Sequence, residues 1–171
     1  MQVTMAGGRR SRLADIIDGA IAGVVATWAL DRVTTWLYER EDGQARRRED
    51  DARGGKTAYA VAAEKTASLV GRTLTNEESE HEGARIHWAL GAATGALYGA
   101  WRGRTAQTTM LNGLLFGTAV FLLMDEGLVY ALNLTPGPTK FPWQAHARGL
   151  AGHLAFGAAA EGTLRVLQQT A

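Results

Sequence analysis

Four apolar stretches of helical length, separated by polar connections, dominate the order of hydrophobic and polar positions along the chain. They cover about residues 13–37, 84–101, 109–134 and 145–166. Each stretch is rich in Gly and Ala, and its apolar positions have helical spacing. The pattern predicts an all-α fold, a bundle of four glycine-rich transmembrane helices that forms a single membrane domain over residues 1–171.

The first connection, residues 39–75, is long and strongly charged. Twelve of the eighteen residues from Glu39 to Lys56 carry a charge, with acidic and basic residues in short alternating blocks. Such a segment favours a solvated loop. From about Thr57 to Leu74 apolar positions recur at helical spacing, but the segment is too polar to cross a bilayer, so we expect one amphipathic helix in this loop. Thr75 to Glu78 has the form of a capping box and predicts the start of the second long helix.

The chain repeats itself in the spacing of Gly, His and Asp. The first and third stretches share the order Gly-x3-Gly-x7-Asp, at Gly19, Gly23 and Asp31 and at Gly113, Gly117 and Asp125. The second and fourth stretches share the order Gly-x3-His-x3-Gly, at Gly83, His87 and Gly91 and at Gly149, His153 and Gly157. Two matches in the same order predict a duplicated helix pair, with halves related by a pseudo-two-fold axis along the membrane normal.

Glycines spaced four residues apart form a ridge along one face of a helix. In water a mid-helix Gly costs roughly 1 kcal/mol relative to Ala, whereas in a bilayer small residues let helices pack closely. The spacing therefore favours a membrane bundle. We expect helix contacts at Gly19, Gly23, Gly91, Gly95, Gly99, Gly113, Gly117, Gly149 and Gly157. The mean hydropathy of the chain is slightly negative, at −0.11, and a soluble helical bundle is the alternative.

Basic residues and tryptophans predict how the bundle lies in a membrane. Arginines gather before the first stretch, after the second and near the C-terminus, at Arg9, Arg10, Arg12, Arg102, Arg104 and Arg165. The positive-inside rule then places both termini in the cytoplasm and the charged connection outside. Trp88 and Trp101 bracket the second stretch, about 20 Å apart along a helix, a placement typical of the two membrane interfaces.

The last third of the chain carries a family resemblance. Leu134-Thr135-Pro136 is followed by Phe141-Pro142-Trp143, by Gly152-His153 and by Glu161. This order and spacing resembles the C-terminal half of the YagU-like family of bacterial inner-membrane proteins, and the glycine-rich helices are also similar. The resemblance excludes the charged connection. It implies a small protein with several spans in the bacterial inner (plasma) membrane, and it implies no particular reaction, because the function of this family is unknown.

The polar residues inside the apolar stretches are the candidates for function, because ionisable groups in a membrane are costly and face the bundle interior. They are Asp31, His87, Asp125, Glu126, His153 and Glu161. Four interpretations are open: hydrogen bonds that fix helix register, a relay for protons or ions, two axial histidines of a haem, or a metal site of two His and two Asp. The first two need no cofactor, and we expect none.

Composition excludes several classes of protein. The chain has no Cys, which excludes disulfides and thiolate chemistry. A net charge of +1 gives no attraction to nucleic acid, and no nucleophile motif points to an enzyme. We expect a small transporter or channel-like protein that moves protons, ions or a small solute. The alternatives are a non-catalytic accessory subunit, packed against a larger membrane complex or copies of itself, and a haem- or metal-binding membrane protein.

Overall fold

The computed structural model describes residues 11–105 and 108–169, and these residues form helices and connections with no strand. The prediction of an all-α fold is confirmed. Arg9 and Arg10 of the basic tail lie outside the described residues. In chain order the helices are α1 (Arg12–Tyr38), α2 (Gly43–Arg53), α3 (Ala58–Ser68), α4 (Asn76–Arg102), α5 (Met110–Leu123), the π-helical turn η1 (Met124–Leu128), α6 (Val129–Ala131), the 3-10 turn η2 (Pro138–Lys140) and α7 (Trp143–Gln169).

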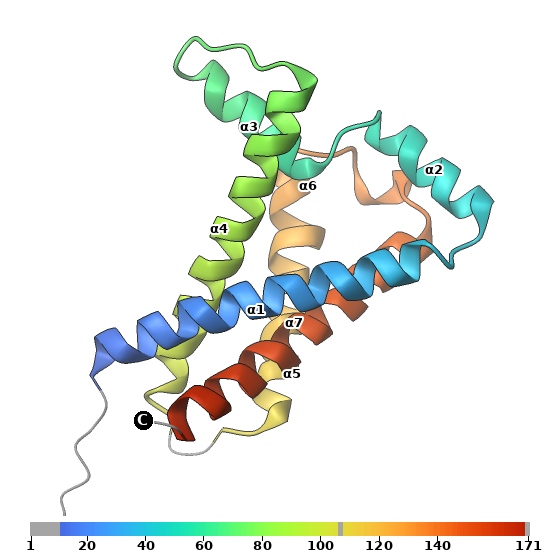
Figure 1. Ribbon diagram of the computed structural model, residues 1–171. Helices are drawn as coiled ribbons and strands as arrows, with labels where there is room; N and C mark the ends of the chain where they lie inside the picture. The colour runs from blue at the N-terminus through green and yellow to red at the C-terminus, as the bar shows by residue number, and fades with distance from the viewer. Residues whose placement is uncertain (1–10, 106–107, 170–171) are drawn as a thin grey trace, which may run out of the picture.

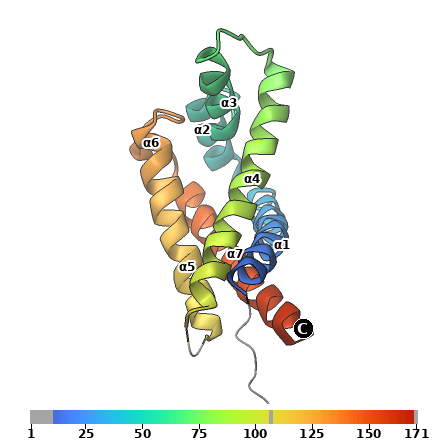
Figure 2. The ribbon, with the colours of Figure 1, turned by 90° about the vertical axis from the view of Figure 1, so that its left-hand side faces the viewer.

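The long helices pack in the order α4, α1, α7 and α5, so that α1 and α7 are central (Figure 1). The start of α1, the end of α4, the start of α5 and the end of α7 lie together at one end of the bundle. At the opposite end α4 and α6 diverge, and α2 and α3 lie between them (Figure 2). The bundle is therefore tight at one end and splayed at the other.

Glycine allows the tight packing of both outer helices. A Cβ atom on Gly19 of α1 would lie 2.5 Å from the carbonyl oxygen of Gly95 in α4. In the other pair, a Cβ atom on Gly113 of α5 would lie 2.8 Å from the Cβ of Glu161 in α7. No side chain fits at such distances, so the α1–α4 and α5–α7 pairs approach backbone to backbone, as small-residue ridges do in membranes.

The charged connection contains a helix, α2, where the sequence favours a solvated loop, and that prediction is wrong. The Asp42 side chain caps the N-terminus by accepting hydrogen bonds from the amides of Gln44 and Ala45, and Gly54 ends the helix at φ 61°. Glu49, in the middle of α2, is only 1% exposed. The helix is thus anchored on the bundle by the face that carries Glu49, while Arg47, Arg48 and Asp51 are exposed.

The expected amphipathic helix is α3, and it connects the two splayed helices. Gly83 of α4 lies so close that a Cβ on it would meet the backbone nitrogen of Ala60 at 2.7 Å. On the opposite side, Lys65 donates hydrogen bonds to the carbonyl oxygens of Leu132 (2.7 Å) and Asn133 (3.0 Å), just after α6. An ammonium group at a helix C-terminus is favourable, because those carbonyls lack helical partners.

The docking of α3 on α4 is expected to weaken in acid. Glu64 accepts hydrogen bonds from Lys56 and Ser79, which lower its pKa from the ordinary 4.5. A lowered folded-state pKa contributes stability that is present above 4.5 and is lost as the pH falls through the folded value. The protection factors of the α3 amides, which correct exchange rates for their intrinsic pH dependence, should therefore fall as the pH drops below 4.5. Glu64→Gln should remove most of this dependence, and an unchanged pH profile in that variant would contradict the assignment.

Two helical segments are long and apolar enough to cross a membrane among the described residues, Arg12–Tyr38 and Met110–Ala131. Only 33% and 11% of their most apolar windows are buried inside the protein. Helices α4 and α7 do not meet the same criterion, so the structure supports two candidate spans and an all-helical bundle. The extra charges of α4 lie in its first turns, whereas those of α7 include the buried Arg148 and Glu161.

Candidate functional site

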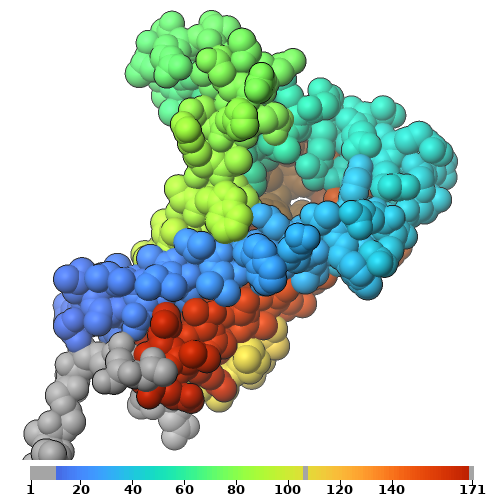
Figure 3. Space-filling model, in the orientation of Figure 1, coloured from blue at the N-terminus to red at the C-terminus, as the bar shows by residue number. Residues whose placement is uncertain are grey.

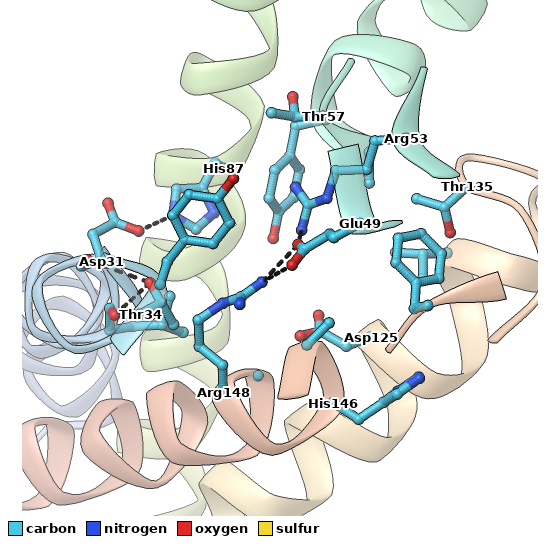
Figure 4. Close-up of a pocket in the computed structure, with 18 of the residues that line it drawn as sticks. Asp31, Thr34, Glu49, Arg53, Thr57, His87, Asp125, Thr135, His146 and Arg148 are labelled. Atoms are coloured by element: carbon cyan, nitrogen blue, oxygen red, sulfur yellow. Dashed lines mark hydrogen bonds and ion pairs between the residues drawn. The ribbon is translucent and has the colours of Figure 1, made fainter. Parts of the chain in front are cut away.

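A cavity of about 600 Å³ lies at the splayed end of the bundle. Its wall is made by the last turns of α1, the first half of α4, the π-turn η1 and the start of α7, and residues of α2 and α3 complete it. Figure 3 shows the surface hollowed here, between α4, α2 and α1. Figure 4 shows polar side chains that reach into the space from several different helices.

Two Asp–His pairs line the cavity. Nε2 of His87 on α4 lies 2.9 Å from Oδ1 of Asp31 on α1, a hydrogen bond in which the ring donates (Figure 4). Nδ1 of His153 on α7 lies 3.6 Å from Oδ2 of Asp125, an ion-pair distance. Nδ1 of His153 also donates to the carbonyl oxygen of Gly149 at 3.0 Å, which fixes the proton on that nitrogen. Each helix pair therefore carries one Asp–His contact just beyond its glycine contact.

Asp125 and Glu126 share the π-helical turn η1, where one extra residue widens the helix. Both carboxylates line the cavity. Glu126 lies 2.6 Å from Nδ1 of His146, whose Nε2 lies 3.2 Å from the carbonyl oxygen of Pro138. Both ring nitrogens of His146 therefore face oxygen acceptors. π-Turns recur at functional sites, and this one places two consecutive acids on the same cavity.

Tyr59 of α3 lies over the Asp–His pairs, a contribution that the sequence did not predict. Its ring centroid is 4.7 Å from that of His87. Burial raises the pKa of the Tyr59 hydroxyl above 10.0, and the charges of Asp125 and Asp31 raise it further. Because Tyr59 and both Asp–His pairs line the same cavity, the two pairs belong to a single site.

A buried ionic network closes the side of the cavity under α2. Arg148 of α7 donates to both carboxylate oxygens of Glu49 at 2.6 Å (Figure 4) and also to Glu41. Arg53 pairs with Glu49 as well, and the Arg148 guanidinium stacks 5.0 Å from the ring centre of Tyr38. Both arginines that line the cavity are therefore paired with carboxylates, those of Glu49 in α2 and Glu41 just before it. These partners were not predictable from the spacing of residues along the chain.

Glu161 does not belong to the cavity. It is fully buried, and its carboxylate accepts hydrogen bonds from Tyr98 (2.8 Å), Arg102 (2.9 and 3.1 Å) and Arg165 (2.8 Å). It follows His153 by eight positions in α7, about 12 Å along the helix axis. Glu161, which the sequence analysis grouped with the other polar candidates, instead accepts the hydrogen bonds of an ionic cluster at the tight end of the bundle.

The predicted glycine ridges all lie at contacts. Gly19, Gly23, Gly91, Gly95 and Gly99 lie between α1 and α4. Those of the other pair, between α5 or η1 and α7, are Gly113, Gly117, Gly149 and Gly157. Gly149 differs in kind, because a Cβ there would meet the Phe121 side chain at 2.9 Å, beside Asp125. The ridges form the tight half of the bundle, next to the cavity and not within its centre.

The cavity holds no set of ligands for a metal ion. Within the described ranges 11–105 and 108–169, no three His, Asp or Glu side chains gather closely enough to hold one. His87 engages Asp31 through Nε2, and His153 engages Gly149 through Nδ1. The described residues thus do not support the metal-site interpretation, and the Asp–His contacts are those that the hydrogen-bonding and proton-relay interpretations require.

No protein-family model matches the sequence, and no curated protein or solved structure is significantly similar to the chain.

Proposed function

We propose that this chain is a small integral membrane transporter, which moves protons, ions or a small solute through the Asp–His cavity. The convergence of Asp31–His87 and Asp125–His153 on one cavity carries the proposal. Ionisable groups are rare in membrane helices and mark ion and proton pathways when they line an internal space. The proposal includes no catalytic residue.

A bilayer location is supported by the outer surfaces of α1 and α5. Large apolar side chains are exposed along both helices, including Ile17, Ile21, Val24 and Trp28 on α1 and Leu111, Leu115, Leu122 and Leu123 on α5. A soluble monomer rarely exposes contiguous apolar surface on this scale. The buried core is mostly Ala, with Tyr98, Phe156 and Leu164, so contact with lipid and close backbone packing would stabilise the bundle.

The proposed topology has four spans, with both termini in the cytoplasm of a bacterium and the cavity open to the outside. Helix α4 would cross with its charge-free second half, and α7 would cross within the bundle, where its charged groups are paired. Exposed Trp36 and Trp143 near the cavity end and Trp101 at the other end suit the two interfaces. The matching Gly and Asp–His contacts of the two pairs support an internal duplication.

The test is proton flux into liposomes that contain the purified protein and a trapped pH-sensitive dye. A pH gradient should drive flux through the wild-type protein. Asp31→Asn together with Asp125→Asn should lower it at least about tenfold, because Asn keeps the shape of the side chain but cannot bind and release a proton in this range. Glu77→Gln, at a side chain that is 88% exposed, is the matched control.

Two outcomes would overturn the proposal. One is release of the protein from membranes by a carbonate wash, since an integral protein stays until detergent is added. The other is equal flux in the double Asn variant and the wild type.

An accessory subunit is the second candidate, and the structure changes the way to test it. The small-residue ridge of Gly91, Gly95 and Gly99 is not available to a partner, because α1 of the same chain covers it. A partner or second copy would instead meet the exposed apolar faces of α1 or α5. Cross-linking from Leu115→Cys in native membranes, compared with the flux assay, would separate the two candidates.

A further inference from the structure

The charge of the cavity is strongly one-sided. Six carboxylates line it, and they belong to Asp31, Glu49, Asp50, Glu80, Asp125 and Glu126. Only two permanently cationic side chains, those of Arg53 and Arg148, face them, and both pair with Glu49. The three cavity histidines engage Asp31, Asp125 and Glu126. With neutral histidines the lining carries an excess of four negative charges, which attracts cations and repels anions.

Aromatic rings share the lining with these acids. They belong to Tyr38, Tyr59, Phe121, Tyr130 and Phe141. Ring faces attract cations most strongly when water is displaced, and such sites select organic ammonium groups. An ammonium or guanidinium group would thus meet both carboxylates and ring faces in this cavity.

The size and ligand geometry of the cavity separate an organic cation from a metal ion. A volume of about 600 Å³ is within the usual range for small-molecule sites, about 300–1,000 Å³. A bare metal ion would need three or more converging ligands, and the described residues provide no such group.

We propose that the cavity binds a small organic cation, with its ammonium or guanidinium group against Asp31 and Asp125 and its apolar part against the aromatic rings. This substrate class rests on the proposed transport function. The side chains of the two acids are 40% and 35% exposed, so both are accessible from the cavity. Glu49 is not available, because two arginines hold it.

The test measures binding of choline to the full-length protein in detergent by titration calorimetry, at constant ionic strength. The comparison ligand is the uncharged isostere of choline, in which carbon replaces the quaternary nitrogen. Choline should bind at least about tenfold more tightly than the isostere, and a methylguanidinium probe should compete with it. Asp125→Asn should weaken choline binding about tenfold or more, whereas Glu77→Gln should leave it unchanged.

Equal affinities for choline and its isostere would overturn the proposal, and so would wild-type affinity in Asp125→Asn. A thermal unfolding midpoint measured on each variant shows that weaker binding is not loss of the fold. The results distinguish a failure of the proposed substrate class from a failure of the proposed transport function. Proton flux that depends on Asp31 and Asp125, without choline or methylguanidinium binding, would overturn the substrate class alone. Absence of both flux and binding would overturn both.

Discussion

Gly95→Leu is expected to prevent the α1–α4 pair from forming. A Cβ atom at Gly95 would lie 2.5 Å from the backbone nitrogen of Gly23, and it would also overlap Gly19. The obstacle is backbone, so no rotamer change can relieve it. Overpacking of a close-packed site by a few atoms costs about 1–3 kcal/mol, and here a whole side chain must be placed where none fits. The expected result is a protein that is degraded in cells or elutes as aggregate in detergent.

Substitution of alanine at two glycines gives a graded version with a matched control. Gly95→Ala should lower the unfolding midpoint in detergent clearly, because even a methyl group meets backbone atoms. Gly162 is also in the middle of a long helix, α7, but a Cβ there would have no atom within 4 Å. Gly162→Ala should be neutral or stabilising by up to about 1 kcal/mol. Equal midpoints for the two variants would show that the glycine contact does not hold the pair together.

Removal of the Glu161 carboxylate is expected to destabilise the fold nearly as much as Gly95→Leu does. In Glu161→Ala the guanidinium of Arg102, which is 8% exposed, loses its ion pair inside the bundle. Breaking one side of a buried pair costs about 3–5 kcal/mol, because a charge is left without compensation. For a chain of this size that is a fall of roughly 10 °C in the unfolding midpoint. Circular dichroism during heating in detergent would measure it.

The double variant Glu161→Leu with Arg102→Met tests the reason for that loss. An apolar pair of similar volume needs no compensating charge, and such replacements of buried ion pairs are often neutral. Recovery should be partial, because the Tyr98 hydroxyl loses its acceptor and Arg165, at 39% exposed, must turn to solvent. If the double variant is less stable than Glu161→Ala, the cost does not come from the unpaired charge.

Periodicity along single helices made the long helices and the glycine contacts predictable. Residues four apart share a helix face, so Gly19 and Gly23 were expected on one side of α1. Matching spacing in two stretches further suggested that Asp31 and Asp125 have comparable surroundings, and each lies beside a histidine in the structure. Glu161 shows the limit of this reasoning. It shares a ridge with His153, but distance along the axis puts it in another cluster.

The ionic network that closes the cavity under α2 was not predictable from the local sequence pattern. Glu49 stands among charged residues that are typical of a solvated loop, and its partner Arg148 is 99 positions away in sequence. Nothing in the spacing of either residue marks the pair. The π-turn at Asp125 and Glu126 was not predictable either, because the sequence there continues an ordinary α-helical pattern. Such features depend on which segments meet in three dimensions, and the local spacing of residues does not contain that information.

The contrast between the tight and the splayed half has an electrical consequence for the proposed topology. A membrane potential falls mainly where water is excluded, so across a cavity open to water it would barely change. A proton that reaches Asp31 from the outside would therefore still be close to the outside potential. Nearly all the electrical work, about 2.3 kcal/mol per charge at 100 mV, would be done across the glycine-packed half. The turns around Gly19 and Gly23, with their partners on α4, would thus form the thin water-excluding layer across which the potential falls.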